Sequence, residues 1–136
     1  MINGVVASKL DHLETTVQHL ESLQPLSQER LQDWIVRSAV ERNLQVSVEA
    51  KLDICHRLIG LLQASPATSG RQALERCQNL GVLEQASIYF PLVGLRDIVV
   101  HEYQTIDPTI LGEIVNSKLG VLRQFAREVH DFVAQH

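Results

Sequence analysis

The residues best suited to chemistry lie close together in the second half of the sequence. Arg96, Asp97, His101 and Tyr103 fall within eight consecutive positions. Histidine exchanges protons near neutral pH, and the guanidinium of arginine forks onto two phosphate oxygens. These groups are suited to cleaving an RNA phosphodiester without a metal, because the neighbouring 2′-hydroxyl supplies the nucleophile. Asp97 lies four positions before His101, where it can orient the imidazole of a helical segment.

Helical geometry alone does not bring the guanidinium and the imidazole to one point. Arg96 and Tyr103 share a face of an ideal helix, whereas His101 lies roughly 140° away from Arg96. A two-fold dimer across this segment would supply two copies of each side chain to one cleft. Spacing alone leaves a second interpretation open, in which these are solvated side chains in local ion pairs and Tyr103 is a half-buried packing residue.

The composition limits the class of function. The formal net charge of the 136 residues is −4, which excludes a broad basic surface for non-specific duplex binding. Aromatic residues make up 4%, which disfavours all-β folds and aromatic platforms for base stacking. The two cysteines have neither metal-ligand spacing nor the number that a disulfide scaffold needs. With no signal-peptide pattern and no apolar run of about 18 residues, we expect a cytoplasmic protein without a membrane partner.

Helical periodicity runs through most of the chain and predicts the elements that must position the cluster. Apolar residues recur at three- and four-residue steps, without sustained two-residue alternation. We expect an all-α, up-and-down bundle of four to five helices in a single domain over residues 1–136. The expected helices cover residues 2–22, 28–63, 71–80, 83–103 and 107–136.

Local signals refine these expectations. Ser27 is placed to cap the second helix, which is either one very long helix or two with a bend near Asn43. Pro91 should break or kink the fourth helix. Asp107 and Pro108 read as an N-cap followed by proline in the first turn of the last helix.

Four other residues invite an interpretation. Arg42 and Asp53 fall on the central helix, where a buried charge must find a partner, so we expect them to tie helices together. His56 is expected to be structural because no second metal-type residue follows it by four positions. Trp34 is expected to anchor either the core or a dimer interface.

The pattern Arg96-x4-His101-x-Tyr103 resembles the R-x4-H-x-Y signature of HepT-like toxins, which belong to the HEPN class of all-helical ribonucleases. Residues 40–59 resemble the long central helix of that family. The resemblance implies a HEPN-like bundle that forms a homodimer and cleaves RNA, with tRNA as the target. It further implies that Arg96 stabilises the scissile phosphate, that His101 is the acid and base, and that cleavage needs no cofactor or metal.

The same resemblance implies a protein partner. Toxins of this family are encoded beside an MNT-type nucleotidyltransferase antitoxin, and Tyr103 matches the tyrosine on which that enzyme places AMP. Bulky, negatively charged phosphates beside Arg96 would compete with RNA. Asp97 departs from the family, in which asparagine often follows the arginine, and it brings negative charge close to the RNA phosphate.

Three functions from different classes follow from these observations. The first is a ribonuclease toxin silenced by AMPylation. The second is a non-catalytic helical subunit that binds the nucleotidyltransferase, which the acidic charge and Asp97 favour. The third is a helical dimer that makes regulatory contacts.

Overall fold

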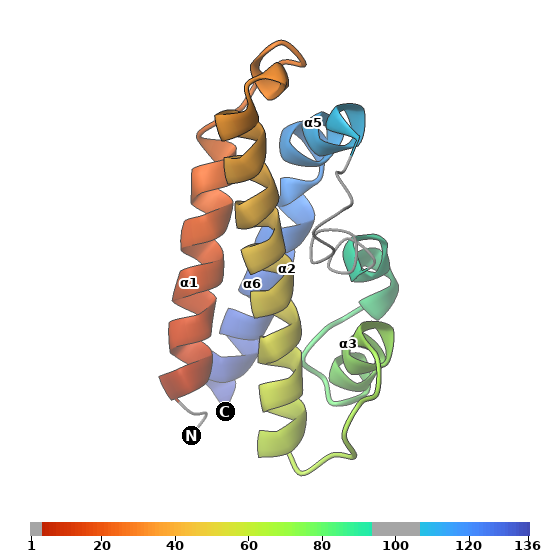
Figure 1. Cartoon of the computed structure of the whole chain (residues 1–136). Coiled ribbons are helices and arrows are strands. Elements are labelled where there is room, and N and C mark those ends of the chain that lie inside the picture. The colour runs from red at the N-terminus through yellow and green to blue at the C-terminus, as the bar shows by residue number, and fades with distance from the viewer. Residues whose placement is uncertain (1–3, 94–106) are drawn as a thin grey trace.

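The computed structural model describes residues 4–93 and 107–136 of the chain. Every regular element within these ranges is helical, with η denoting a 3-10 helix (Figure 1). None of the helices described there is long and apolar enough to span a bilayer. In chain order the elements are α1 (Gly4–Glu21), η1 (Arg30–Gln32), α2 (Trp34–Leu61), α3 (Gly70–Asn79), η2 (Ala86–Leu92), α5 (Pro108–Ser117) and α6 (Leu119–Gln135).

The long helices form an up-and-down bundle with α2 at its centre. Helix α1 packs against α2 and α6, and both of these run antiparallel to it, so the start of α1 and the end of α6 lie at the same end of the bundle (Figure 1). The shorter α3 and η2 pack against each other, and α3 also contacts α2. The expected all-α, up-and-down architecture is confirmed.

Helix α2 begins later than the sequence suggested. Asp33 has extended backbone angles, and its carboxylate accepts a hydrogen bond of 2.9 Å from the N–H of Ile35, so it caps a helix that starts at Trp34. The hydroxyl of Ser27 instead accepts a hydrogen bond of 3.1 Å from the N–H of Arg30, at the start of η1. From Trp34 the helix runs unbroken to Leu61, so of the two alternatives the single very long helix is confirmed.

The last expected helix is two helices. Helix α5 ends at Ser117 and α6 begins at Leu119, with Lys118 between them. The Ser117 hydroxyl donates to the carbonyl of Glu113 at 2.6 Å, a back-bond that favours a bend in a helix. Gly112 and Gly120 on either side weaken the helical preference further.

Burial and contacts decide the expectations about three side chains. Trp34 is 67% exposed, so it does not anchor the core of this chain. Arg42 is exposed and bonds Gln45 of its own helix at 3.4 Å, so the expectation that it ties helices together is wrong. Asp53 is also exposed, but its carboxylate lies 3.5 Å from the Nζ of Lys9 on α1, so it does join two helices as expected. The charged residue that α2 does bury is Lys51, which is 0% exposed.

Candidate active site

The four residues singled out for chemistry lie outside the described part of the chain. Arg96, Asp97, His101 and Tyr103 all belong to residues 94–106. Their assignments as catalytic, supporting and modified residues therefore stay predictions. The structure describes the two flanks of this segment, which are η2 with Val93 on one side and Asp107 with α5 on the other.

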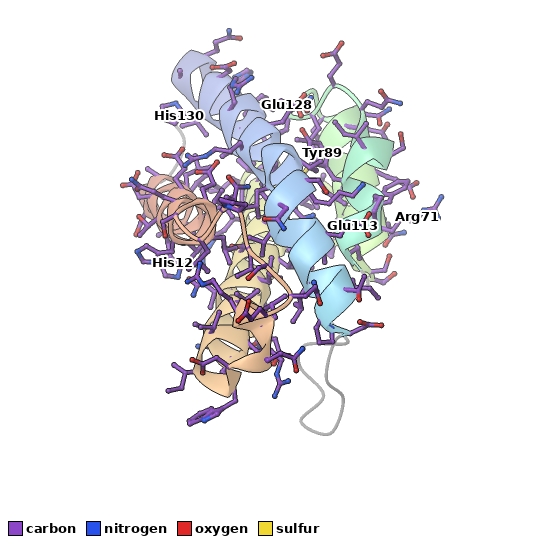
Figure 2. All side chains as sticks on the ribbon, turned by 90° about the horizontal axis from the view of Figure 1, so that it is seen from above. His12, Arg71, Tyr89, Glu113, Glu128 and His130 are labelled. Atoms are coloured by element: carbon purple, nitrogen blue, oxygen red, sulfur yellow. The ribbon has the colours of Figure 1, made fainter. Side chains whose placement is uncertain are left out.

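The flank before the segment is built around Tyr89, the fully buried residue in the middle of η2. Its ring packs edge-to-face against Phe125 of α6, with centroids 5.5 Å apart and an interplanar angle of 83°. Its hydroxyl donates a hydrogen bond to the carboxylate of Glu128, also on α6 (Figure 2). Burial, and then the Glu128 carboxylate, raise the pKa of Tyr89 well above its ordinary value, so the phenol stays protonated and donating.

The connection from α3 into η2 is also fastened by side chains. The second carboxylate oxygen of Glu128 accepts a hydrogen bond of 2.9 Å from the N–H of Glu84. The side-chain carbonyl of Gln78 accepts one of 2.7 Å from the N–H of Ala86, the first residue of η2. Helices α3 and α6 thus both hold the chain as it enters η2.

Val93, the last described residue before the segment, approaches α3 closely. A Cβ atom added at Gly70 would lie 2.8 Å from Cγ1 of Val93 and 3.2 Å from Cδ2 of Leu52. Glycine at the start of α3 therefore permits α2, α3 and Val93 to meet. The guanidinium of Arg71 covers the neighbouring Phe90 ring at 4.4 Å from its centroid, a cation–π contact.

The flank after the segment begins with the predicted helix cap. The Asp107 carboxylate accepts a hydrogen bond of 2.8 Å from the N–H of Thr109, and Pro108 occupies the first turn of α5. The side chain of Gln28 donates to the carbonyl of Pro108 at 3.0 Å. The connection between α1 and α2 therefore holds the N-terminal end of α5.

The bonds between Asn116 and Leu26 fasten the other end of α5. The Asn116 amide accepts from the Leu26 N–H at 2.8 Å and donates to the Leu26 carbonyl at 2.9 Å. Both flanks of the segment that carries the R-x4-H-x-Y pattern are thus tied to the bundle.

Sequence reasoning missed the buried ammonium of Lys51 beneath η2. Its Nζ donates to the carbonyl oxygen of Tyr89 at 3.4 Å. Burial lowers the pKa of Lys51 from its ordinary value of 10.5 to about 8, because a cation is costly to remove from water. A signal for it exists in the sequence, since Lys51 continues the three- and four-residue steps of Leu44, Val48 and Cys55.

The cysteines lie beside this ammonium. Cys55 and Cys77 are both buried and free, and the Cys77 thiol lies 3.8 Å from the Cys55 carbonyl. The hydrogen bond with Cys77 and then burial raise the pKa of Cys55 well above its ordinary value, so its thiol is a packing group and not a ready nucleophile.

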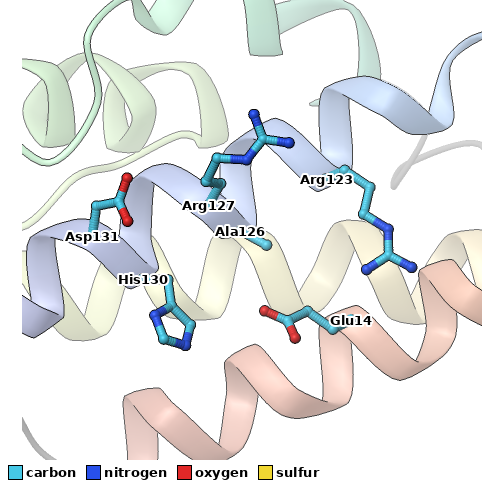
Figure 3. A pocket seen from close by; sticks show the side chains of 6 residues that line it. All are labelled: Glu14, Arg123, Ala126, Arg127, His130 and Asp131. Atoms are coloured by element: carbon cyan, nitrogen blue, oxygen red, sulfur yellow. The ribbon is translucent and has the colours of Figure 1, made fainter.

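A hollow of about 380 Å³ lies elsewhere, between α1 and α6. Figure 3 shows Arg123 and His130 of α6 pointing toward α1 and Glu14 of α1 pointing back, while the Arg127 guanidinium points away from α1. Nε of Arg123 bonds both carboxylate oxygens of Glu21 at 3.2 Å, which holds the pKa of Glu21 below its ordinary value. Cations and anions alternate here, so the hollow is not a basic track for RNA.

No group of three or more His, Cys, Asp or Glu side chains could hold a metal ion in the ranges 4–93 and 107–136. The described residues form the surroundings of the R-x4-H-x-Y segment. These surroundings are the buried Tyr89 and Lys51 on one side, and on the other the helix α5 with its Asp107 cap. The architecture defines the class as an all-helical bundle that carries this segment between η2 and α5.

Comparison with known proteins identifies the family. A family model described as Ribonuclease HepT-like matches residues 13–129, and the chain belongs to this family. The mRNA nuclease HepT of Shewanella oneidensis is 24% identical over 126 residues, which cover 91% of this chain and 95% of that protein. The tRNA nuclease HepT of Aphanizomenon flos-aquae is 23% identical over 132 residues, covering 95% and 90% of the two chains.

Solved structures share the fold. The tri-AMPylated Shewanella oneidensis HEPN toxin in complex with its MNT antitoxin superposes with a TM-score of 0.84 at 23% identity, covering 96% of this chain and 99% of that one. The cytosolic protein YutE of Bacillus subtilis, of unknown function, superposes with a TM-score of 0.76 at 18% identity, covering 95% and 91%. The expected family, HEPN-like fold and ribonuclease class are confirmed.

Proposed function

We propose that this chain is the toxin of a toxin–antitoxin pair and acts as a metal-independent endoribonuclease. The observation that carries the proposal is the family match over residues 13–129, which contains the whole Arg96-x4-His101-x-Tyr103 pattern. The anchored flanks support it, because a segment tied at both ends can present side chains in a defined geometry.

The proposed reaction is an internal transfer at the RNA backbone. The 2′-hydroxyl oxygen attacks the adjacent phosphorus, the bond to the 5′-oxygen breaks, and a 2′,3′-cyclic phosphate and a 5′-hydroxyl remain. His101 takes the proton from the 2′-hydroxyl and supplies one to the leaving oxygen. Arg96 binds the phosphate oxygens as negative charge builds on them, and Asp97 orients the imidazole.

We propose a homodimer as the active form. Two copies of the segment would meet in one cleft, so Arg96 of one copy could work with His101 of the other even if an ideal helix would separate the two side chains by about 140°. The chain then acts as a single HEPN-like domain over residues 1–136 in the cytoplasm. The structural neighbour YutE, a cytosolic protein, supports this location.

The proposed antitoxin is an MNT-type nucleotidyltransferase that modifies Tyr103. The phenol oxygen attacks the α-phosphorus of ATP, an O–P bond forms, pyrophosphate leaves, and the phenolic proton passes to solvent. The Shewanella oneidensis toxin is tri-AMPylated and in complex with its MNT antitoxin, which supports this partner. Each AMP adds negative charge close to Arg96 and so opposes RNA binding.

RNA is the proposed substrate, with tRNA the preferred class. The two named relatives differ in the class of RNA that they cleave, since one is an mRNA nuclease and the other a tRNA nuclease. Incubation of the protein with total tRNA and with an mRNA of equal length and concentration decides between them by the rate of cleavage.

The test of the proposal is RNA cleavage by the purified protein in EDTA. We expect fragments ending in a cyclic phosphate, and a loss of roughly 100-fold or more in rate for Arg96→Ala and His101→Ala. Arg42→Ala and His56→Ala are matched controls, because both residues are exposed on α2, and they should cleave like the parent. Parent-like cleavage by Arg96→Ala or His101→Ala would show that the assigned site is wrong.

The second candidate function is the non-catalytic helical subunit of a nucleotidyltransferase complex. The net charge of −4 and the presence of Asp97 favour it. Stable co-purification with the nucleotidyltransferase, together with no RNA cleavage and no growth arrest when the chain is expressed alone, would support this function over the first.

A further inference from the structure

The buried lysine of α2 is the charged group that the proposed function leaves unexplained. Among the described residues, Lys51 is the one charged side chain that is fully buried. No carboxylate within the described ranges forms an ion pair with it. An unpaired buried cation is among the most costly features of a protein interior, so an interaction that uses the charge is expected.

The hydrogen bond of Lys51 leads directly to the flank of the site. Its Nζ donates to the carbonyl oxygen of Tyr89 at 3.4 Å, and the hydroxyl of the same tyrosine donates to Glu128. Tyr89 is therefore held from α2 through its backbone and from α6 through its side chain. Both attachments fix η2, which ends at Leu92, four positions before Arg96.

We propose that Lys51 is a positioning residue for the cleavage reaction: its ammonium holds the Tyr89 carbonyl and so sets the direction in which η2 delivers the chain toward Arg96. This inference rests on the function proposed above. Lys51 does not touch RNA; it acts through the backbone of η2.

The charge state of Lys51 makes the proposal testable by pH. A charged donor forms a stronger hydrogen bond than a neutral one, so the hold on Tyr89 weakens when the ammonium loses its proton. Burial lowers the pKa of Lys51 to about 8, which places that loss near pH 8. Among the described residues, the titratable groups that bear on it are the Cys55 thiol on α2, which Cys77 of α3 contacts, and Tyr89 of η2, whose hydroxyl is bonded to Glu128 of α6.

The kinetic experiment compares the parent with Lys51→Met, a straight side chain of similar length without the charge. We expect kcat of Lys51→Met to be about tenfold lower at pH 7, as for a small displacement of catalytic groups, with KM changed less. The ratio of parent to variant should fall toward one by pH 9, because the parent also loses its charge.

The control is Lys9→Met, which makes the same substitution at a lysine of α1 that is partly exposed. Its ratio to the parent should stay near one at both pH values. A parent-to-variant ratio for Lys51→Met that stays at one, or that exceeds one by the same factor at every pH, would overturn the proposal.

Amide hydrogen exchange tests the same inference without any enzymatic activity. Protection factors of residues 86–93 should fall about tenfold in Lys51→Met at pH 7, and in the parent between pH 7 and pH 9, while those of α1 do not fall. If neither protein cleaves RNA but η2 responds in this way, the proposed function fails and the hold of Lys51 on η2 stands. Unchanged protection of η2 would refute the role of Lys51 whatever the activity.

Discussion

The buried ammonium also predicts how stability depends on pH. Burial lowers the pKa of Lys51 from 10.5 to about 8, a gap of roughly 2.5 pH units. At about 1.4 kcal/mol for each unit, the charged form costs the folded state roughly 3.5 kcal/mol. Replacing Lys51 by methionine removes this cost and loses a hydrogen bond worth about 1–2 kcal/mol, so the free energy of unfolding should rise by about 2 kcal/mol at pH 7.

The sign of the pH effect follows from proton counts. The folded pKa is lower than the unfolded one, so between pH 8 and 10.5 the unfolded chain binds more protons than the folded chain. The contribution of Lys51 to the free energy of unfolding of the parent therefore rises between pH 8 and pH 10.5. Below pH 8 the full cost of burying the charged ammonium is present. The advantage of Lys51→Met over the parent should accordingly shrink by about 2 kcal/mol between pH 7 and pH 9.5.

The assay is urea unfolding followed by circular dichroism at both pH values. Both proteins share the titration of the tyrosines, which cancels when the parent is subtracted from Lys51→Met. The thiol of Cys55 stays protonated in both folded proteins, because its pKa is raised well above its ordinary value even beside the Lys51 charge, and removing that charge raises it further. Lys9→Met, at a residue whose ammonium is partly exposed, should show no such change between the two pH values. An equal difference between Lys51→Met and the parent at pH 7 and pH 9.5 would refute the argument that Lys51 is buried with its charge.

Three further substitutions test the frame around the site. Tyr89→Phe removes the hydroxyl that donates to Glu128 and should lower the free energy of unfolding by about 1–2 kcal/mol, measured in urea; a loss smaller than about 0.5 kcal/mol would argue against this bond. Asp107→Ala removes the cap on the N–H of Thr109 and should cost about 1 kcal/mol in the same measurement, whereas Asp107→Asn should restore most of it. Trp34→Ser should change monomer stability by less than about 0.5 kcal/mol because Trp34 is 67% exposed, and it should raise the dissociation constant of the proposed dimer at least about tenfold by sedimentation; an unchanged constant would reject Trp34 as a dimer anchor.

The chain carries local signals, which act within a few residues, and long-range contacts, which join residues far apart in the sequence. Local signals are sufficient for the helices themselves, because three- and four-residue periodicity and short capping patterns act within a few residues. The cap formed by Asp107 and Pro108 illustrates this, since both residues lie in the chain where the helix begins. The same reasoning places the start of α2 at residue 28, six residues too early, because it does not recognise Asp33 as the stronger cap.

The sequence indicates the candidate site through a motif and not through helical periodicity. The R-x4-H-x-Y pattern and the block over residues 40–59 are enough to indicate the family, which the match over residues 13–129 confirms. The roles of Arg96, His101 and Tyr103 remain predictions, since spacing cannot show where side chains meet. The anchors of the flanks, such as Asn116 on Leu26, join residues about 90 positions apart and leave no local pattern.

The amino-acid sequence by itself thus determined the helical class, most helix positions and the family of this protein, because each depends on residue types at short, regular intervals. Only the tertiary structure decided that Trp34 faces solvent, that Lys51 lies in the core beneath Tyr89, and that both flanks of the R-x4-H-x-Y segment are clamped. Periodicity defines which side of a helix is apolar, but the depth of burial depends on what packs against that side. For Lys51 that neighbour is η2, whose Tyr89 lies 38 residues further along the chain.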